Sequence, residues 1–216
     1  MLTPTDIIYY FVYLVCLVFS FIKTGNLKGI AIIRSVLILG LANELFVEWL
    51  QYLGKEENFS HFIYIPAEYF LLCFFYLQHT QNRIIRHLII YSLPVYLLAV
   101  FFLSLKVYSF ETYPSIIYNI GCILSTIWLT LIMFNIDIVD NKPLVQIPVF
   151  WLFSGLLIFY AGVYFFNTAY AFLIADSPSL AWELRIYINL GLNIILYTSW
   201  TYAFICSAKM KNYIYH

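Results

Sequence analysis

The chain of 216 residues is 63% hydrophobic and 10% charged. An ordinary soluble domain has roughly 45–50% apolar and about 25% charged residues, so this composition argues against a soluble enzyme, a disordered chain or a disulfide-rich secreted domain. The 11 basic residues balance the 11 acidic ones, and no nucleic-acid partner is expected. We therefore expect an integral membrane protein that has the lipid bilayer as a partner.

Seven apolar runs are long enough to cross a bilayer, because about 20 helical residues span a hydrocarbon core of roughly 30 Å. Short polar breaks separate the runs, and none of the breaks is long enough to form another domain. We predict an all-α fold, a polytopic membrane helix bundle that forms a single domain over 1–216. Its seven transmembrane helices are expected at about 6–23, 30–53, 61–79, 88–105, 114–134, 148–173 and 183–207. Any output domain is expected to belong to another protein.

The distribution of lysine and arginine predicts the orientation, because these residues favour cytoplasmic loops. One set of alternate loops and helix ends carries Lys23, Lys28, Arg34, Arg83, Arg86, Lys142, Lys209 and Lys211. The opposite set carries only Lys55, Lys106 and Arg185. We therefore expect the N-terminus outside, the C-terminus in the cytoplasm, and a multi-pass protein of the cytoplasmic (inner) membrane.

Polar residues inside the spans are the main functional signal. An ionisable group in a span costs about 2.5–3.5 kcal/mol and normally faces the bundle interior or a cavity. Counted at 1.5 Å per residue from the outer helix ends, carboxylates and amides of five helices lie about 8–14 Å deep, with one arginine a turn above them. These residues predict an outward-facing polar pocket lined by Glu44, Glu48, Glu68, Asn119, Asn167, Arg185, Asn189 and Asn193.

Two other interpretations of these residues remain open. Asparagines and glutamates in membrane bundles also serve as interhelical hydrogen-bonding groups, worth about 0.6 kcal/mol each on average. Glu44 and Glu48, one helical turn apart, could instead bind a cation, or one of them could be protonated. The sequence does not indicate whether a metal ion is bound, and it predicts no cofactor.

The sequence offers no adequate catalytic set. The zinc-protease motifs H-E-x-x-H and H-x-x-E-H and the nucleophile motif G-x-S-x-G are absent. The four cysteines, Cys16, Cys73, Cys122 and Cys206, each lie in an apolar run, which favours buried thiols over a metal or disulfide site. An enzyme is the less favoured interpretation.

The Glu44–Glu48 stripe, the segment Tyr64-Ile65-Pro66-Ala67-Glu68-Tyr69-Phe70 and the composition rich in Tyr, Phe, Ile and Asn carry a resemblance. In these features the chain resembles uncharacterised seven-helix bacterial membrane proteins, some of which precede histidine-kinase or other output domains as sensory modules. The resemblance implies a sensing or partner-coupled role and assigns no ligand. Unlike those sensory modules, this chain is expected to carry no kinase domain of its own.

Three functions follow, in order of preference. The first is sensory or accessory ligand binding, in which occupancy or protonation of the pocket shifts helix packing and a cytoplasmic or membrane signalling partner detects the shift. The alternative is a small-solute or ion-coupled transporter that uses the same carboxylates. The third is an intramembrane lipid-modifying enzyme. The sequence leaves the ligand and the oligomeric state open.

The predicted orientation can be tested by cysteine labelling. We expect a membrane-impermeant thiol reagent to modify Glu57→Cys and to spare Asn82→Cys in intact cells, on a background in which the four native cysteines are replaced. The opposite pattern would reverse the orientation and turn the predicted pocket to the cytoplasmic side.

Overall fold

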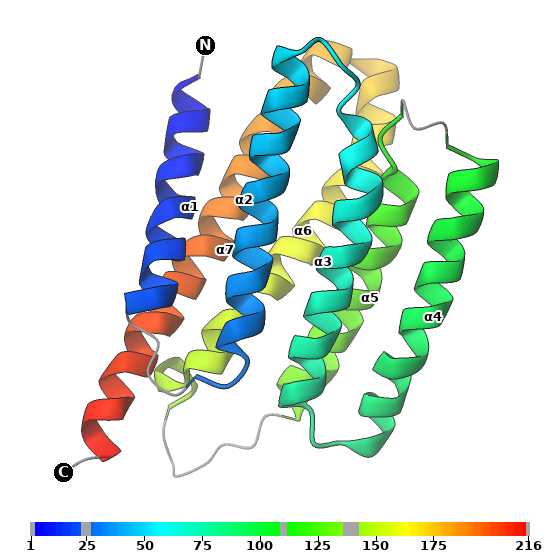
Figure 1. The fold of residues 1–216 in the computed structure, drawn as a ribbon. Helices are drawn as coiled ribbons and strands as arrows, with labels where there is room; N and C mark the ends of the chain where they lie inside the picture. The colour runs from blue at the N-terminus through cyan, green and yellow to red at the C-terminus, as the bar shows by residue number, and fades with distance from the viewer. Residues whose placement is uncertain (1–2, 23–26, 109–111, 136–142, 215–216) are drawn as a thin grey trace. The chain divides into compact units, whose positions relative to one another are not determined.

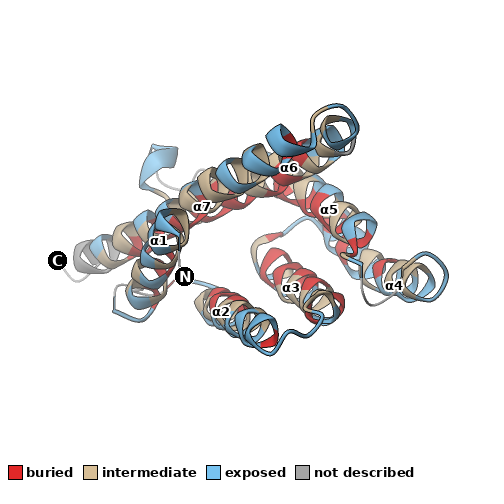
Figure 2. Cartoon of the chain, turned by 90° about the horizontal axis from the view of Figure 1, so that it is seen from above, coloured by how far each residue is buried: buried red, intermediate tan, exposed pale blue. Residues whose placement is uncertain are grey.

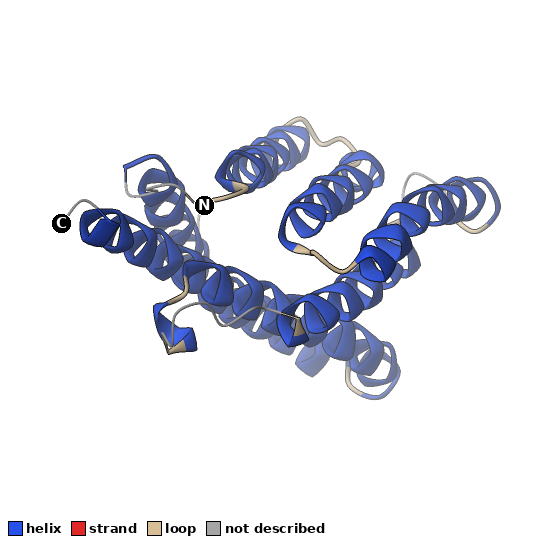
Figure 3. Ribbon diagram, turned by 90° about the horizontal axis from the view of Figure 1, so that it is seen from below, coloured by secondary structure: helices blue, strands red, loops and turns tan. Residues whose placement is uncertain are grey.

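The computed structural model describes residues 3–22, 27–108, 112–135 and 143–214. These residues form seven α-helices and one short 3-10 helix, and no strand occurs among them (Figures 1 and 3). In chain order the elements are α1 Pro4–Ile22, α2 Ile30–Tyr52, α3 Asn58–His79, α4 Arg83–Lys106, α5 Ser115–Phe134, η2 Leu144–Gln146, α6 Pro148–Asp176 and α7 Pro178–Ile214.

All seven α-helices of the described segments are long and apolar enough to cross a membrane. The predicted all-α class and the seven helices that are long and apolar enough to cross a membrane are therefore confirmed. Several helices extend past the predicted spans: α3 begins at Asn58, α4 begins at Arg83 and α7 continues to Ile214. Hydropathy detects only the hydrocarbon-embedded part of a helix, whereas backbone hydrogen bonding continues into the interfacial region. The direction in which the termini point stays a prediction, and Lys23 and Lys142 lie outside the described residues.

Local sequence signals end and begin the helices of the α2–α4 segment. After α2, the Gly54 backbone N–H donates to Gln51 O and the Lys55 N–H to Leu50 O, and Gly54 has φ +65°. This is a Schellman C-cap, which requires a residue that tolerates the left-handed conformation. Before α4, the Asn82 side chain accepts hydrogen bonds from the Ile84 and Ile85 backbone N–H groups, as an N-cap does.

The helices group into two compact units. One consists of residues 1–28 and 136–216, with α1, η2, α6 and α7, and the other consists of residues 29–135, with α2 to α5. The single domain over 1–216 stays a prediction.

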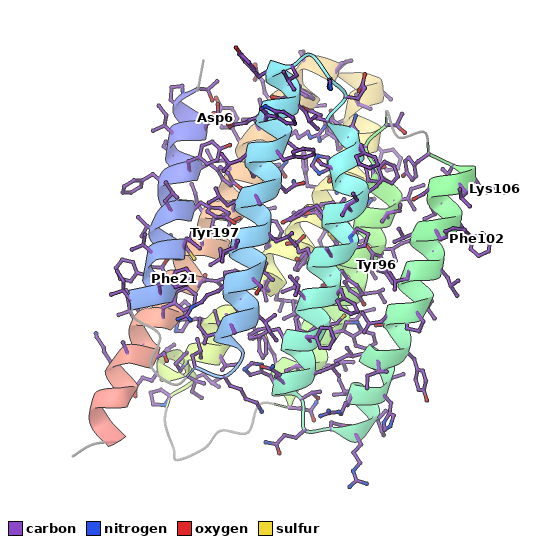
Figure 4. All side chains as sticks on the ribbon, viewed as in Figure 1. Asp6, Phe21, Tyr96, Phe102, Lys106 and Tyr197 are labelled. Atoms are coloured by element: carbon purple, nitrogen blue, oxygen red, sulfur yellow. The ribbon has the colours of Figure 1, made fainter. Side chains whose placement is uncertain are left out.

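In the unit of α2 to α5, α3 contacts each of the other three helices, and α4 also contacts α5. Figure 2 shows many buried residues along α3, whereas much of α4 is exposed. Phe102 on α4 is 60% exposed, as expected of a lipid-facing side chain (Figure 4). Gly29 at the start of α2 has φ +78°, and a Cβ there would approach Phe75 Cδ2 to 2.8 Å. A glycine at this position thus lets the start of α2 lie directly against α3.

In the unit of α1, α6 and α7, the last two helices pack closely along their lengths. A Cβ on Gly155 of α6 would lie 2.9 Å from the Ser199 Cβ of α7. Near this contact the Trp200 indole donates to the Leu152 carbonyl at 3.2 Å. On α1, the Tyr13 ring lies 4.6 Å from the ring of Tyr197 in a T-shaped pair. Small residues therefore bring α6 and α7 together, and tyrosines join α1 to α7.

The α6–α7 contact predicts opposite effects of one substitution at two glycines. Gly155→Ala should lower the stability by about 1–3 kcal/mol, because the new methyl group would overlap the Ser199 Cβ. Gly191→Ala on α7 is the matched control, since a Cβ there meets no atom within 4 Å. It should leave the stability unchanged or raise it by up to about 1 kcal/mol. Thermal unfolding in detergent measures both, and equal effects would contradict the close α6–α7 contact.

Candidate functional site

Glu44 and Glu48 form a carboxylate pair on α2. Glu44 is half-buried and Glu48 is exposed, one helical turn apart. The charge that acts on Glu44 comes from Glu48 on the same helix. At the end of α2 the Gln51 side-chain amide donates to the Glu57 carboxylate, so Gln51 is engaged in the α2–α3 turn. In the structure, Glu44 and Glu48 therefore interact as neighbouring carboxylates on one helix.

Glu68 lies in the middle of α3, which remains helical through Pro66. Its side chain is half-buried. The charge of Glu68 acts on groups contributed by α3, α4 and α5, namely Tyr76, Tyr96, Tyr118 and Cys122. Glu68 therefore lies near side chains of three helices of this unit.

Asn119 on α5 is half-buried. Before α5 begins, the Tyr113 ring lies 5.0 Å from the His61 ring of α3. This contact joins the chain just before α5 to the first turn of α3. That Asn119 lies level with Glu68 stays a prediction.

A buried hydrogen-bonded network joins α3, α4 and α5 directly beside Glu68. The Trp128 indole N–H donates to the Tyr69 hydroxyl at 3.2 Å, and the Tyr69 hydroxyl lies 3.0 Å from Ser92 Oγ. Since Ser92 Oγ donates to the Ile89 carbonyl at 2.7 Å, the Tyr69 hydroxyl is the donor to Ser92. Each hydroxyl of the network thereby has both a donor and an acceptor, which is the state expected of polar groups in a membrane interior.

Tyr96 of α4 extends the network toward α5. Its ring lies 4.4 Å from the Tyr69 ring, and its hydroxyl donates to the Ile117 carbonyl at 3.3 Å. A Cβ on Gly121 would lie 3.2 Å from this hydroxyl, so the glycine provides the space for it. Sequence reasoning assigned no role to these aromatic side chains and missed this network. The one available signal was that Tyr69, Ser92 and Trp128 lie in apolar runs, where their polar groups would need hydrogen-bonding partners.

The remaining predicted site residues belong to the unit of α1, α6 and α7. Arg185 is half-buried, with its guanidinium carbon 5.6 Å from the Tyr170 ring of α6 and 5.5 Å from the Trp182 ring of α7. The Asn193 amide donates to the Asn189 carbonyl one turn earlier, at 2.8 Å. Asn167 and Asn189 are half-buried. Arg185 thus makes cation–π contacts with these two rings, and the Asn193 side chain is hydrogen-bonded within its own helix.

The eight predicted pocket residues therefore fall into two sets. Glu44, Glu48, Glu68 and Asn119 lie in one unit, and Asn167, Arg185, Asn189 and Asn193 lie in the other. A single pocket lined by all eight stays a prediction. Among the described residues, no group of three or more His, Cys, Asp or Glu side chains could hold a metal ion. The four cysteines are free thiols, and Cys16, Cys73 and Cys122 are buried, which confirms that prediction for these three.

Comparisons with protein-family models, with curated proteins and with solved structures found no match to this chain.

The network beside Glu68 predicts a stability effect at Tyr69. Tyr69→Phe should lower the free energy of unfolding by about 1–3 kcal/mol, because it leaves the buried Trp128 N–H without its acceptor. Tyr91→Phe on α4 is the control. Its side chain is 65% exposed, so the stability should change by less than about 0.5 kcal/mol. The measurement is thermal or denaturant unfolding in detergent, and indistinguishable variants would argue against the network.

Proposed function

We propose that the protein is a sensory or accessory protein of the cytoplasmic membrane in which Glu68 is the centre of a polar binding site. Binding of a small polar ligand, or of a proton, changes the charge at Glu68 and shifts the packing of α3, α4 and α5. A cytoplasmic or membrane signalling partner then detects the shifted packing. In the predicted orientation the site opens to the outside.

One observation supports the proposal: Glu68 is a half-buried carboxyl group in the middle of α3, adjacent in sequence to Tyr69, whose hydroxyl is hydrogen-bonded to α4 and α5. Electrostatic interactions are strong where water is scarce, so gain or loss of this charge alters the energy of the α3–α4 and α3–α5 contacts together. A group with that reach can convert a local event into a change of helix packing.

A transporter is less well supported by the geometry. Transporters commonly bind their substrate at discontinuous helices near the bilayer midplane. Here α3 passes through Pro66 and α4 passes through Pro94 without a break in the helix. The carboxylates of α2 and α3 nevertheless make ion coupling the alternative to be tested.

The proposal predicts that protonation of Glu68 changes the dynamics of three helices. We expect the protection of α3, α4 and α5 against hydrogen–deuterium exchange, taken relative to the intrinsic exchange rate at each pH, to depend on pH across the titration of a carboxyl group. The difference should reach about tenfold, which corresponds to about 1.4 kcal/mol of opening free energy. Glu68→Gln, which keeps the shape but cannot ionise, should abolish this dependence.

Glu183→Gln is the matched control, because Glu183 is exposed on α7. It should retain the wild-type dependence in α3 to α5. An unchanged pH dependence in Glu68→Gln would refute the role of Glu68. Proton uptake by proteoliposomes that is driven by a pH gradient and lost in Glu68→Gln would instead favour the transporter.

A further inference from the structure

Two helices of the unit of α2 to α5 carry a proline in their interior. Pro66 lies within α3 and Pro94 lies within α4. Proline has no backbone N–H to donate to the carbonyl four residues earlier, and its ring crowds that carbonyl, so a helix is weakest at this point. The neighbouring helix α5 contains no proline between Ser115 and Phe134. Helices α3 and α4 can therefore bend at one defined place each, whereas α5 has no such place.

The two prolines lie at the same level of the α3–α4 pair. On α4, Pro94 lies between Ser92 and Tyr96, and both of these residues contact Tyr69 of α3. Ser92 Oγ is 3.0 Å from the Tyr69 hydroxyl, and the Tyr96 ring is 4.4 Å from the Tyr69 ring. Pro66 is three residues before Tyr69, about 4.5 Å along the helix, and the Tyr69 side chain leans toward it. The two weak points therefore lie within about one helical turn of each other.

The buried network fixes the helices on one side of this level. The Trp128 indole of α5 donates to the Tyr69 hydroxyl, which in turn donates to Ser92 of α4. Tyr69 and Ser92 both lie on the side of the prolines that faces the α3–α4 turn, so this side of both helices is attached to α5. On the opposite side are residues 58–65 of α3 and 95–106 of α4, which together we call the distal segments.

Two tyrosine hydroxyls hold the distal segments against the start of α5. The hydroxyl of Tyr108, two residues after α4, accepts a hydrogen bond from the Ile116 backbone N–H at 2.7 Å. The N-cap residue of α5, Pro114, makes no side-chain capping hydrogen bond, so Tyr108 caps this helix from outside it. The Tyr96 hydroxyl donates to the Ile117 carbonyl at 3.3 Å. Both contacts are single hydrogen bonds to the first turn of α5, and either can be released without unfolding a helix.

We propose that the distal segments form a flap that bends away from α5 at Pro66 and Pro94 and is latched on α5 by Tyr96 and Tyr108. The Phe62 ring of α3 lies 6.1 Å from the Tyr108 ring in a T-shaped pair, so the two distal segments move together. The structure shows the closed flap. The hinge and the latch do not depend on a change of charge, so this inference goes beyond the proposed function and is tested separately from it.

Thiol labelling of the full chain in lipid nanodiscs tests the latch. Ile117→Cys is the reporter, because Ile117 is 1% exposed and lies in the first turn of α5, so N-ethylmaleimide reaches it when the flap opens. Cys73, 0% exposed on the fixed part of α3, is the internal control, and peptide mass spectrometry measures both rates in one sample. We expect Tyr108→Phe to raise the reporter rate about fivefold, because it removes one latch hydrogen bond and keeps the ring. Tyr91→Phe, on the 65% exposed Tyr91 of the fixed part, should leave the rate unchanged.

The hinge is tested in the same assay. Pro66→Ala and Pro94→Ala together, added to Tyr108→Phe, should return the reporter rate to the wild-type value, because alanine restores the backbone N–H at both weak points. An unchanged rate in Tyr108→Phe would overturn the latch, and a raised rate that the two alanines do not lower would overturn the hinge. An equal rise at Cys73 would mean that the whole unit loosens, and it would overturn both. Labelling is done at a single pH, so each of these outcomes leaves the proposed function of Glu68 standing.

Discussion

The hydrocarbon interior of a bilayer offers no hydrogen-bonding partners, and every polar group in a span must therefore find one within the protein. Threonine and asparagine side chains in this chain commonly meet that requirement locally. Thr126 donates to the Cys122 carbonyl and Asn193 to the Asn189 carbonyl, each one turn earlier on its own helix. Tyrosine and tryptophan hydroxyl and N–H groups reach too far for this solution. Tyr69, Tyr96, Trp128 and Trp200 have partners on other helices, and these side chains therefore determine which helices are joined by polar contacts.

The same constraint explains why the fold could be predicted from the sequence. A chain that must place its backbone in hydrocarbon has almost no alternative to long apolar helices, and the seven apolar runs were sufficient to place them. The ends were less accurate because they depend on caps instead of hydropathy. Asn82 extends α4 by one turn beyond its apolar run, and the left-handed Gly54 stops α2.

The candidate site was predictable only in part. Helical periodicity places Glu44 beside Glu48, since this follows from residue number alone, whereas the shared depth of Glu68 and Asn119 stays a prediction. The partners of these residues depend on which helices pack together. Nothing in the order of residues predicts that the Trp128 indole donates to Tyr69, or that Arg185 lies against the ring of Tyr170. Polar contacts between helices depend on the tertiary packing, and they could not be predicted from this one sequence.

The central helix α3 combines two kinds of polar group that differ in what they can do. The Tyr69 hydroxyl, with a donor on α5 and an acceptor on α4, has one stable arrangement and fixes the register of three helices. Glu68 has two charge states, and its charge acts on the same helices. In the function proposed above, the fixed contact of Tyr69 lies next to the variable charge of Glu68. The segment of α3 around Tyr76 differs from both, because the buried Tyr76 hydroxyl has no hydrogen-bond partner among the described residues.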